Sequence, residues 1–167
     1  MVLAGGAGRR LGQAKATLVV GGRTLAERAV DTLLPHCRRL VVVSRPGVRL
    51  PPLAADVVLD RPGPEGPLNA LATGLAAVQS DRVLVLACDL PLAAPVVAAD
   101  ADGRAQPLCG RYLRGPALAA CADLLAAGER RILPLLSRLA AGILRCDGDE
   151  LLNVNSPHDL ERLHASL

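Results

Sequence analysis

The sequence of 167 residues has almost no aromatic side chains: it contains no Trp and no Phe, and Tyr112 is its single Tyr. Proteins that bind single-stranded nucleic acid or RNA bases stack the bases on aromatic rings. The formal net charge is only +3, and the basic residues are spread along the chain instead of forming a stripe that could follow a phosphate backbone. We therefore expect no nucleic-acid partner.

Long apolar runs and paired cysteines are also missing. The longest apolar runs, such as residues 83–88, fall far short of the roughly 20 residues that cross a bilayer, and no charged and then apolar leader precedes them. The five cysteines are odd in number and include no Cys-x-x-Cys pair, which favours small buried thiols in a reducing compartment over disulfides or metal ligands. These absences predict a cytoplasmic protein without a membrane partner.

Lysine and a recognisable catalytic nucleophile are scarce as well. Lys15 is the sole lysine among 19 Lys and Arg residues. The three histidines are scattered, and no spacing of Ser, His and Asp, or of Cys and His, places a nucleophile beside a base. Covalent catalysis has no support in the sequence.

The chain is rich in hydrophobic residues, which make up 51% of it. At roughly 150 residues per domain, this length predicts a single domain over residues 1–167. Short apolar runs predict strands at residues 1–4, 40–43, 57–59, 82–87, 106–112 and 143–146. Helical periodicity and capping boxes predict helices at residues 25–35, 68–78, 116–127 and 131–141, and a last helix from Ser156 onward. This alternation predicts a three-layer, Rossmann-like α/β domain with a mostly parallel central sheet.

Glycine-rich or acidic positions follow three of the predicted strands. The loop at residues 5–12 follows the first strand, Asp60 follows the third, and Asp89 follows the strand at residues 82–87. In open α/β sheets, ligands bind beyond the carboxyl ends of the strands. We expect these three positions to share one crevice.

The loop at residues 5–12 combines four glycines with Arg9 and Arg10, and Lys15 follows it. Consecutive glycines allow backbone N–H groups to approach an anion, so the segment can bind phosphates. It is neither Gly-x-Gly-x-x-Gly nor the Walker pattern. The alternative is a flexible surface loop with solvated charges. The single lysine favours phosphate binding, because a compact point charge fits where a forked guanidinium does not.

Asp89 and Asp60 each have two interpretations. Asp89 can bind Mg²⁺, which takes one or two carboxylates together with substrate phosphates, or it can cap a turn before Pro91. Asp60 can accept hydrogen bonds from a nucleoside, or it can cap the Pro- and Gly-rich loop that follows.

The segment from Leu3 to Lys15 resembles the signature loop of nucleotidyltransferases of the nucleotide-diphospho-sugar transferase fold. Residues 66–68 (Gly-Pro-Leu), 88–91 (Cys-Asp-Leu-Pro) and 106–108 (Gln-Pro-Leu) are similar to further motifs of these enzymes, in the same order. Residues 128–131 (Gly-Glu-Arg-Arg) and 152–157 (Leu-Asn-Val-Asn-Ser-Pro) resemble motifs of the molybdenum cofactor guanylyltransferases.

The resemblance implies an enzyme that transfers GMP from GTP to the terminal phosphate of the molybdopterin cofactor and releases pyrophosphate. It implies nucleotide contacts from Leu3, Ala4, Gly5, Gly6, Lys15, Ser44, Asp60 and Asp89. The implied catalytic residues are Lys15, Arg9 and Asp89, with Mg²⁺ on Asp89. The implied acceptor-binding residues are Arg10, Asn153 and Asn155. Nucleotide binding is expected in residues 1–91 and acceptor binding in residues 92–167. Other proteins of molybdenum cofactor biosynthesis are possible partners.

The sequence departs from the family pattern in several places. Ser44 stands where these guanylyltransferases often have Asn, and Asn69-Ala70 stands where they tend to have Ala-Gly. Residues 1–4 make a poor central strand, and the segment between Asp89 and Pro107 is short for the usual helix and strand. Either the chain is a trimmed variant or residues are missing at both places, and we favour missing residues.

Two alternative functions stay open. The first is a related transferase that uses CTP or another phosphorylated acceptor, and the second is a non-catalytic nucleotide-binding module. Guanine presents two adjacent N–H donors, so its site should be built from acceptors. The loops after the first three strands offer the backbone groups of residues 4–6, Ser44 and Asp60, and this set favours GTP over CTP.

Overall fold

The computed structural model describes residues 1–91, 98–99, 105–142, 144–145 and 151–165. Its main sheet has five strands in the order β5-β4-β1-β6-β8. The strands are β1 (Val2–Leu3), β4 (Val41–Ser44), β5 (Asp56–Leu59), β6 (Arg82–Ala87) and β8 (Cys109–Leu113). Neighbouring strands are parallel except for β8, which runs antiparallel to β6. The predicted α/β class with a mostly parallel sheet is confirmed.

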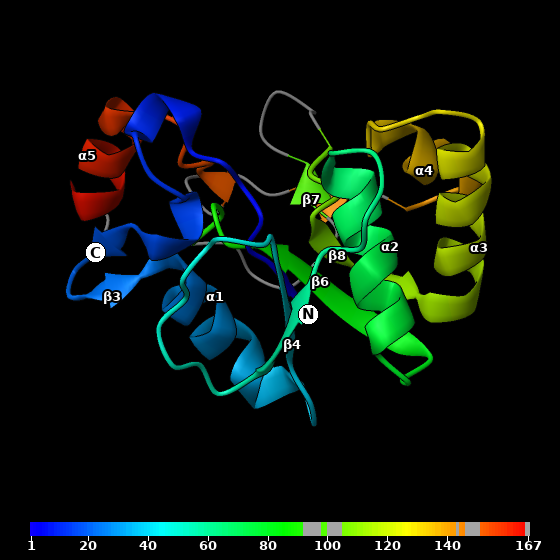
Figure 1. Ribbon diagram of the computed structural model, residues 1–167, viewed down its shortest axis with the longest axis horizontal. Helices are drawn as coiled ribbons and strands as arrows, with labels where there is room; N and C mark the ends of the chain where they lie inside the picture. Colours follow the sequence, from blue (N-terminus) through cyan, green and yellow to red (C-terminus); the bar gives the residue numbers. More distant parts are fainter. Residues whose placement is uncertain (92–97, 100–104, 143, 146–150, 166–167) are drawn as a thin grey trace.

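Helices cover both faces of this sheet (Figure 1). They are α1 (Leu25–Leu33), α2 (Pro67–Ala77), α3 (Arg114–Ala126) and α4 (Leu133–Arg138), and a further helix, α5 (Pro157–Ala165), lies at the side of the molecule. One apolar cluster joins α1 to one face of the sheet through side chains such as Val30 and Val42. A second cluster joins α2, α3 and α4 to the other face through side chains such as Leu71 and Val43. The sheet therefore lies between two helical layers.

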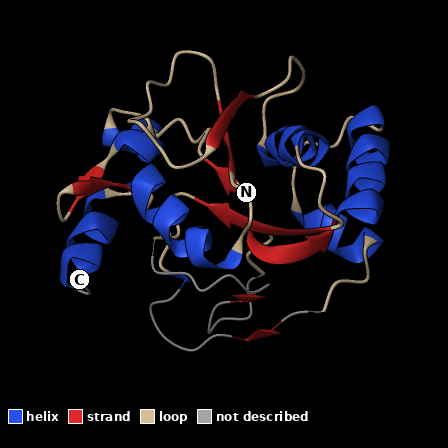
Figure 2. Ribbon diagram, turned by 90° about the horizontal axis from the view of Figure 1, so that it is seen from below, coloured by secondary structure: helices blue, strands red, loops and turns tan. Residues whose placement is uncertain are grey.

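The smaller elements lie at the sides of this arrangement. The hairpin of β2 (Val19–Val20) and β3 (Arg23–Thr24) packs with α5 around a third apolar cluster. The short strands β7 (Ala98–Ala99) and β9 (Leu144–Arg145) pair in parallel apart from the main sheet (Figure 2). Within the described part of the chain, no helix is long and apolar enough to cross a lipid bilayer.

The predicted capping boxes account for where two helices begin. Thr24 Oγ1 accepts a hydrogen bond from the Glu27 amide, and Glu27 accepts one from the Thr24 amide, at the start of α1. At the start of α5, Ser156 and Asp159 make the same reciprocal pair. Each pair satisfies backbone donors that a helix N-terminus leaves without partners.

Strand β1 is short yet central. Val2 pairs with Val42 on one side and Leu86 on the other, and Leu3 continues both ladders. The N-terminus lies in the middle of the molecule in both views (Figures 1 and 2). Residues 1–4, expected to make a poor central strand, thus provide a two-residue strand at the centre of the sheet. Most of the segment between Asp89 and Pro107 lies outside the described residues.

Some element boundaries differ from those predicted. The strand expected at residues 106–112 begins at Cys109, because the Cys109 amide donates to the Gln106 carbonyl in a turn. The helix expected at residues 131–141 ends at Arg138, before Ala140 adopts a positive φ of 46°. The predicted buried strand at residues 57–59 is the edge strand β5, where Leu59 is 55% exposed.

The order of the strands fixes where a ligand can bind. The chain runs outward from β1 to β4 and β5, and then returns to place β6 on the other side of β1. The carboxyl ends of β1 and β6 therefore flank the point where the strand order reverses, which is the usual ligand position in such sheets.

Candidate active site

A cleft of about 270 Å³ opens at this reversal point. Its volume lies just below the range of about 300–1,000 Å³ that is common for small-molecule sites. It is lined by Leu3, Gly5, Gly6, Lys15, Arg45, Asp60, Glu65, Gly66, Pro67, Ala70, Ala87, Cys88, Asp89 and Leu108. The three segments expected to share a crevice are therefore brought together.

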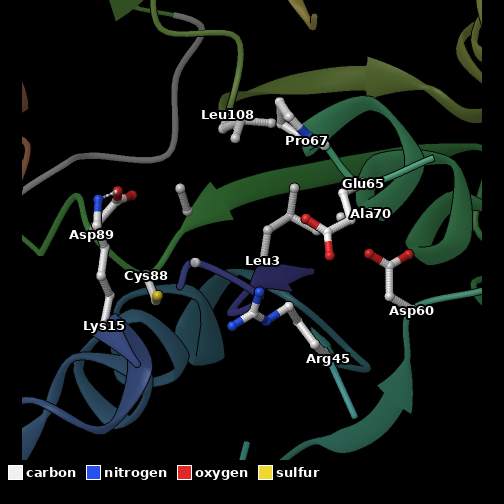
Figure 3. A pocket seen from close by; sticks show the side chains of 14 residues that line it. Leu3, Lys15, Arg45, Asp60, Glu65, Pro67, Ala70, Cys88, Asp89 and Leu108 are labelled. Carbon is white, nitrogen blue, oxygen red and sulfur yellow. Dashed lines mark hydrogen bonds and ion pairs between the residues drawn. The ribbon is translucent and has the colours of Figure 1, made fainter. Parts of the chain in front are cut away.

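One end of the cleft holds an ion pair. Lys15 Nζ donates to Asp89 Oδ2 at 2.6 Å, and the two side chains are 14% and 21% exposed. Lys15 also donates to Asn155 Oδ1. Figure 3 shows the pair at one end, Asp60 at the other, and Arg45 between them. The cleft thus has two basic side chains close to the Gly5–Gly6 backbone.

The two glycines leave room for the stems of these cations. A Cβ atom at Gly5 would lie 3.2 Å from Arg45 Cγ, and one at Gly6 would lie 3.3 Å from Lys15 Cδ. The Lys15 amide also donates to the Gly6 carbonyl at 3.2 Å, which closes the loop. Because Gly5 and Gly6 have no side chains, the stems of Arg45 and Lys15 can pack directly against the loop backbone.

The other end of the cleft contains the Asp60 carboxylate. Asp60 follows β5, and its amide donates to the Ser44 carbonyl at 2.7 Å. Asp60 Oδ1 accepts hydrogen bonds from Asn69 Nδ2 and Thr73 Oγ1, both at 2.9 Å. This carboxylate is an acceptor held in place by α2.

A second, more open pocket adjoins the cleft. It is lined by Ala7, Gly8, Arg10, Lys15, Arg45, Glu65 and Asn155. Three of these residues, Lys15, Arg45 and Glu65, also line the cleft. The Val154 amide donates to the Asp89 carbonyl at 2.8 Å, which holds the Asn153–Asn155 segment against the end of β6. Lys15 therefore lies where the two pockets meet.

The structure does not bring every predicted residue into a pocket. Ala4 and Ser44 are buried and do not line the cleft, and no partner of Ser44 Oγ occurs within the described residues. Asn153 donates to Gln106 Oε1 at 3.4 Å and lines neither the cleft nor the adjoining pocket. Arg9 begins a short 3₁₀ turn, and its side chain lies outside the described part.

Sequence reasoning missed Arg45 and Glu65. Both line the two pockets, but an arginine after a strand carries no signal in a chain whose cations are nearly all arginine. Cys88 also lines the cleft. Burial, reinforced by the neighbouring Asp89 charge, raises the pKa of its thiol far above the usual range. Cys88 therefore stays protonated and is no nucleophile.

The residues at 128–131 support the cleft from outside. Glu129 accepts hydrogen bonds from the amides of Arg130 and Arg131, both at 2.9 Å, and pairs with the Arg131 side chain. A Cβ atom at Gly66 would lie 2.9 Å from the Arg130 carbonyl oxygen. This loop packs against the Gly66 backbone and positions the residues that begin α2.

The donor set limits how a metal could bind. Within the described residues, no group of three His, Cys, Asp or Glu side chains could hold a metal ion. Mg²⁺ is commonly held by one or two carboxylates together with substrate phosphates and water. Asp89, at the end of the cleft, fits that arrangement and does not fit a metal site built from protein ligands alone.

Comparison with known proteins identifies the family. Residues 1–142 match the family described as MobA-like NTP transferase domain. The chain belongs to this MobA-like family. It is 32% identical to the molybdenum cofactor guanylyltransferase of Cereibacter sphaeroides over 189 positions, which cover 100% of this chain and 95% of that protein. It is 33% identical to a Chloroflexus aggregans protein named "Probable molybdenum cofactor guanylyltransferase", with 100% and 93% covered. The family expected from the motifs is confirmed.

Solved structures show the same fold. The molybdopterin-guanine dinucleotide biosynthesis protein A of Archaeoglobus fulgidus matches with a TM-score of 0.76 and 21% identity, over 99% of this chain and 96% of that one. The 2-C-methyl-D-erythritol 4-phosphate cytidylyltransferase of Thermus thermophilus matches with a TM-score of 0.73 and 20% identity, over 99% and 96%. MobA-like chains thus share an architecture with a cytidylyltransferase.

Proposed function

We propose that this chain transfers GMP from GTP to the terminal phosphate of the molybdopterin cofactor and releases pyrophosphate. The observation that carries the proposal is the position of Lys15 at the junction of the two pockets, in contact with Asp89 and Asn155. The relatives named as molybdenum cofactor guanylyltransferases support this choice of reaction.

The nucleotide is placed in the cleft. Its nucleoside lies toward Asp60, and its phosphates lie over the Gly5–Gly6 backbone beside Lys15 and Arg45. Backbone N–H groups and two cations offset the charge of the phosphates. Arg9, whose side chain lies outside the described part, is proposed to add a third cation there.

The acceptor is placed in the adjoining pocket, near Arg10 and Asn155. Asn153 is proposed to support Asn155, because Asn155 Nδ2 donates to its carbonyl at 3.5 Å. Residues 1–91 then hold the nucleotide, and Asn153 and Asn155 bring the second part of the chain to the acceptor. Arg10 is an exception, since it precedes residue 91 and faces the acceptor pocket.

The reaction needs positioning and charge neutralisation more than proton transfer. A phosphate monoester has a second pKa near 6, so at pH 7 the terminal phosphate of the acceptor is mostly dianionic. One of its oxygens attacks the α-phosphorus of GTP, a P–O bond forms, the bond to the β-phosphate breaks, and pyrophosphate leaves with both electrons. Lys15 at the meeting point orients the two phosphates and neutralises charge as it develops.

Mg²⁺ is proposed as the cofactor, held by Asp89 and the triphosphate. When bound, it supplies charge neutralisation at the phosphate oxygens. In the structure Lys15 Nζ donates to Asp89 Oδ2, so the carboxylate that would hold the ion lies beside the cation that would bind the phosphates. The cytoplasmic location and contacts with other proteins of cofactor biosynthesis stay predictions.

The direct test supplies purified protein with GTP labelled at the α-phosphate and with molybdopterin cofactor. Guanine dinucleotide and pyrophosphate should form in equal amounts, and only when both substrates are present. Thermal denaturation with each nucleoside triphosphate gives a second readout, since a ligand at 100 times its Kd adds about 2.7 kcal/mol of stability. Stabilisation by GTP without product would support the non-catalytic module instead.

A further inference from the structure

The Asp60 carboxylate is held from one side by two polar side chains of α2. Asn69 Nδ2 donates to Asp60 Oδ1 at 2.9 Å and to the Arg61 carbonyl at 3.0 Å. Thr73 Oγ1 donates to the same Asp60 Oδ1 at 2.9 Å and accepts from the Arg61 amide at 3.2 Å. These four hydrogen bonds fix both the carboxylate and the backbone that follows it.

Both donors are buried, whereas Asp60 faces the cleft. Asn69 is 9% exposed and Thr73 is 1% exposed, and they are two of the three buried polar residues in the described part. Asp60 is half-buried and lines the cleft. Because Oδ1 receives both hydrogen bonds, Oδ2 is left to accept from a ligand, and within the described residues it has no other partner.

The segment after Asp60 has no regular structure until α2 begins at Pro67. Residues 61–66 are rich in proline and glycine and form bends rather than a helix or strand. A carboxylate at the start of such a segment would rotate, and ordering it on binding would weaken affinity. A Cβ atom at Gly63 would lie 3.2 Å from Asn69 Oδ1, so the segment also passes close over the Asn69 amide.

We propose that Asn69 and Thr73 are positioning residues that hold Asp60 with Oδ2 toward the nucleoside and thereby set nucleotide affinity. Neither residue lines the cleft, so both act through Asp60. The proposal rests on the proposed function, which places the nucleoside at Asp60.

The first experiment measures the affinities of Asn69→Ala and Thr73→Val for GTP and for inorganic triphosphate. Without these hydrogen bonds the Asp60 side chain would have to be ordered when the nucleotide binds, so GTP affinity should fall by up to about tenfold in each variant. Triphosphate affinity should not change, because Lys15 and the glycine backbone are untouched. In turnover assays the loss should raise KM for GTP with little change in kcat. Thr73→Ser keeps the hydroxyl and should restore GTP affinity.

Thr32→Val is the matched control. Thr32 Oγ1 donates to the Arg28 carbonyl of its own helix at 2.9 Å and has no part in the cleft. Thr32→Val removes a helix hydroxyl in the same way as Thr73→Val, but at a position that does not contact Asp60. GTP affinity should therefore stay at the wild-type value. An equal loss in this control would attribute the Thr73→Val effect to general loosening of the fold and overturn the proposal.

A double-mutant cycle with Asp60→Ala shows whether the effect passes through the carboxylate. In the Asp60→Ala background, Thr73→Val should cause no further loss of GTP affinity. Additive losses would overturn the positioning role. If Asp60→Ala weakens GTP binding and both α2 variants bind GTP normally, the inference fails and the proposed function stands. If Asp60→Ala itself binds GTP normally, the placement of the nucleoside fails.

Discussion

Lys15 Nζ and Asp89 Oδ2 lie 2.6 Å apart although the residues are 74 positions apart in the chain. The glycine loop after β1 delivers the cation, and the end of β6 delivers the carboxylate. Because both side chains are mostly buried, the Lys15 charge is already in the cleft before phosphates bind. Ordering this side chain on phosphate binding therefore costs less entropy than ordering a flexible surface lysine would.

Lys15→Ala should reduce turnover by about 100-fold or more, which is the scale of losing one charge-stabilising donor in a reaction centre. The free energy of unfolding should change far less than the activation free energy of the reaction. Lys15→Arg should restore activity only in part, because a planar fork does not reproduce a point charge. Arg23→Ala is the control, since Arg23 pairs with Asp31 on the exposed surface. Wild-type turnover in Lys15→Ala would contradict the assignment of the site.

Asp89→Asn should abolish Mg²⁺-dependent pyrophosphate release while the protein stays folded. Asparagine keeps the size and the turn-forming tendency of the residue and removes the charge that Mg²⁺ requires. Pyrophosphate release is followed as the metal concentration is raised, and thermal denaturation checks the fold. An unchanged metal dependence would mean that Asp89 is a turn cap and that the metal binds elsewhere.

Gly66→Ala should destabilise the protein by about 1–3 kcal/mol, the cost of overpacking or of strained backbone. Gly66 has φ +151°, and an added Cβ would lie 2.9 Å from the Arg130 carbonyl oxygen. Gly115→Ala is the control, because a Cβ there meets nothing within 4 Å. Urea denaturation compares the two variants. Equal stability would show that the 128–131 loop does not pack on Gly66 in solution.

The 128–131 loop should also respond to pH. Hydrogen bonds from the Arg131 side chain, and then from the amides of Arg131 and Arg130, lower the pKa of Glu129 to about 2. A lowered pKa contributes stability above the ordinary value of 4.5, and this stability is lost as pH falls from about 4.5 toward about 2. Glu129→Gln should flatten that part of the stability profile, measured by denaturation at each pH. If Glu129→Gln leaves the dependence of stability on pH unaltered, the Glu129 charge does not stabilise the 128–131 loop.

The alternation of strands and helices was sufficient to predict the α/β class and the shared crevice. Asp60 and Asp89 could be found because they directly follow apolar runs, and parallel strands align their carboxyl ends. The glycine loop could be found because its composition excludes a helix. These predictions depend on local pattern, which the sequence displays directly.

The remaining parts of the site depend on contacts between distant residues. Arg45 is one of many arginines, and only the packing of its stem over Gly5 places it in the cleft. The hydrogen bond from Asn69 to Asp60 depends on how the 61–66 segment folds back on α2. Ser44 was expected beside the nucleotide, but the alternation of side chains along β4 turns it away from the cleft.

GTP should be used at least 100-fold better than CTP in side-by-side assays with molybdopterin cofactor. Guanine has adjacent N–H donors, and the nucleoside end of the cleft offers the Asp60 carboxylate, whose Oδ1 is already occupied and whose Oδ2 is open to the cleft. Cytosine would place its own hydrogen-bond acceptors against the acceptors of the protein. Buried polar groups that are left unpaired in this way weaken binding of the wrong base by several kcal/mol. The two nucleotides share their triphosphate, so Lys15→Ala should impair both and serves to confirm a common phosphate site. Comparable or better use of CTP would refute the guanine assignment and leave the nucleotidyltransferase assignment intact, because the matching family is described as an NTP transferase domain.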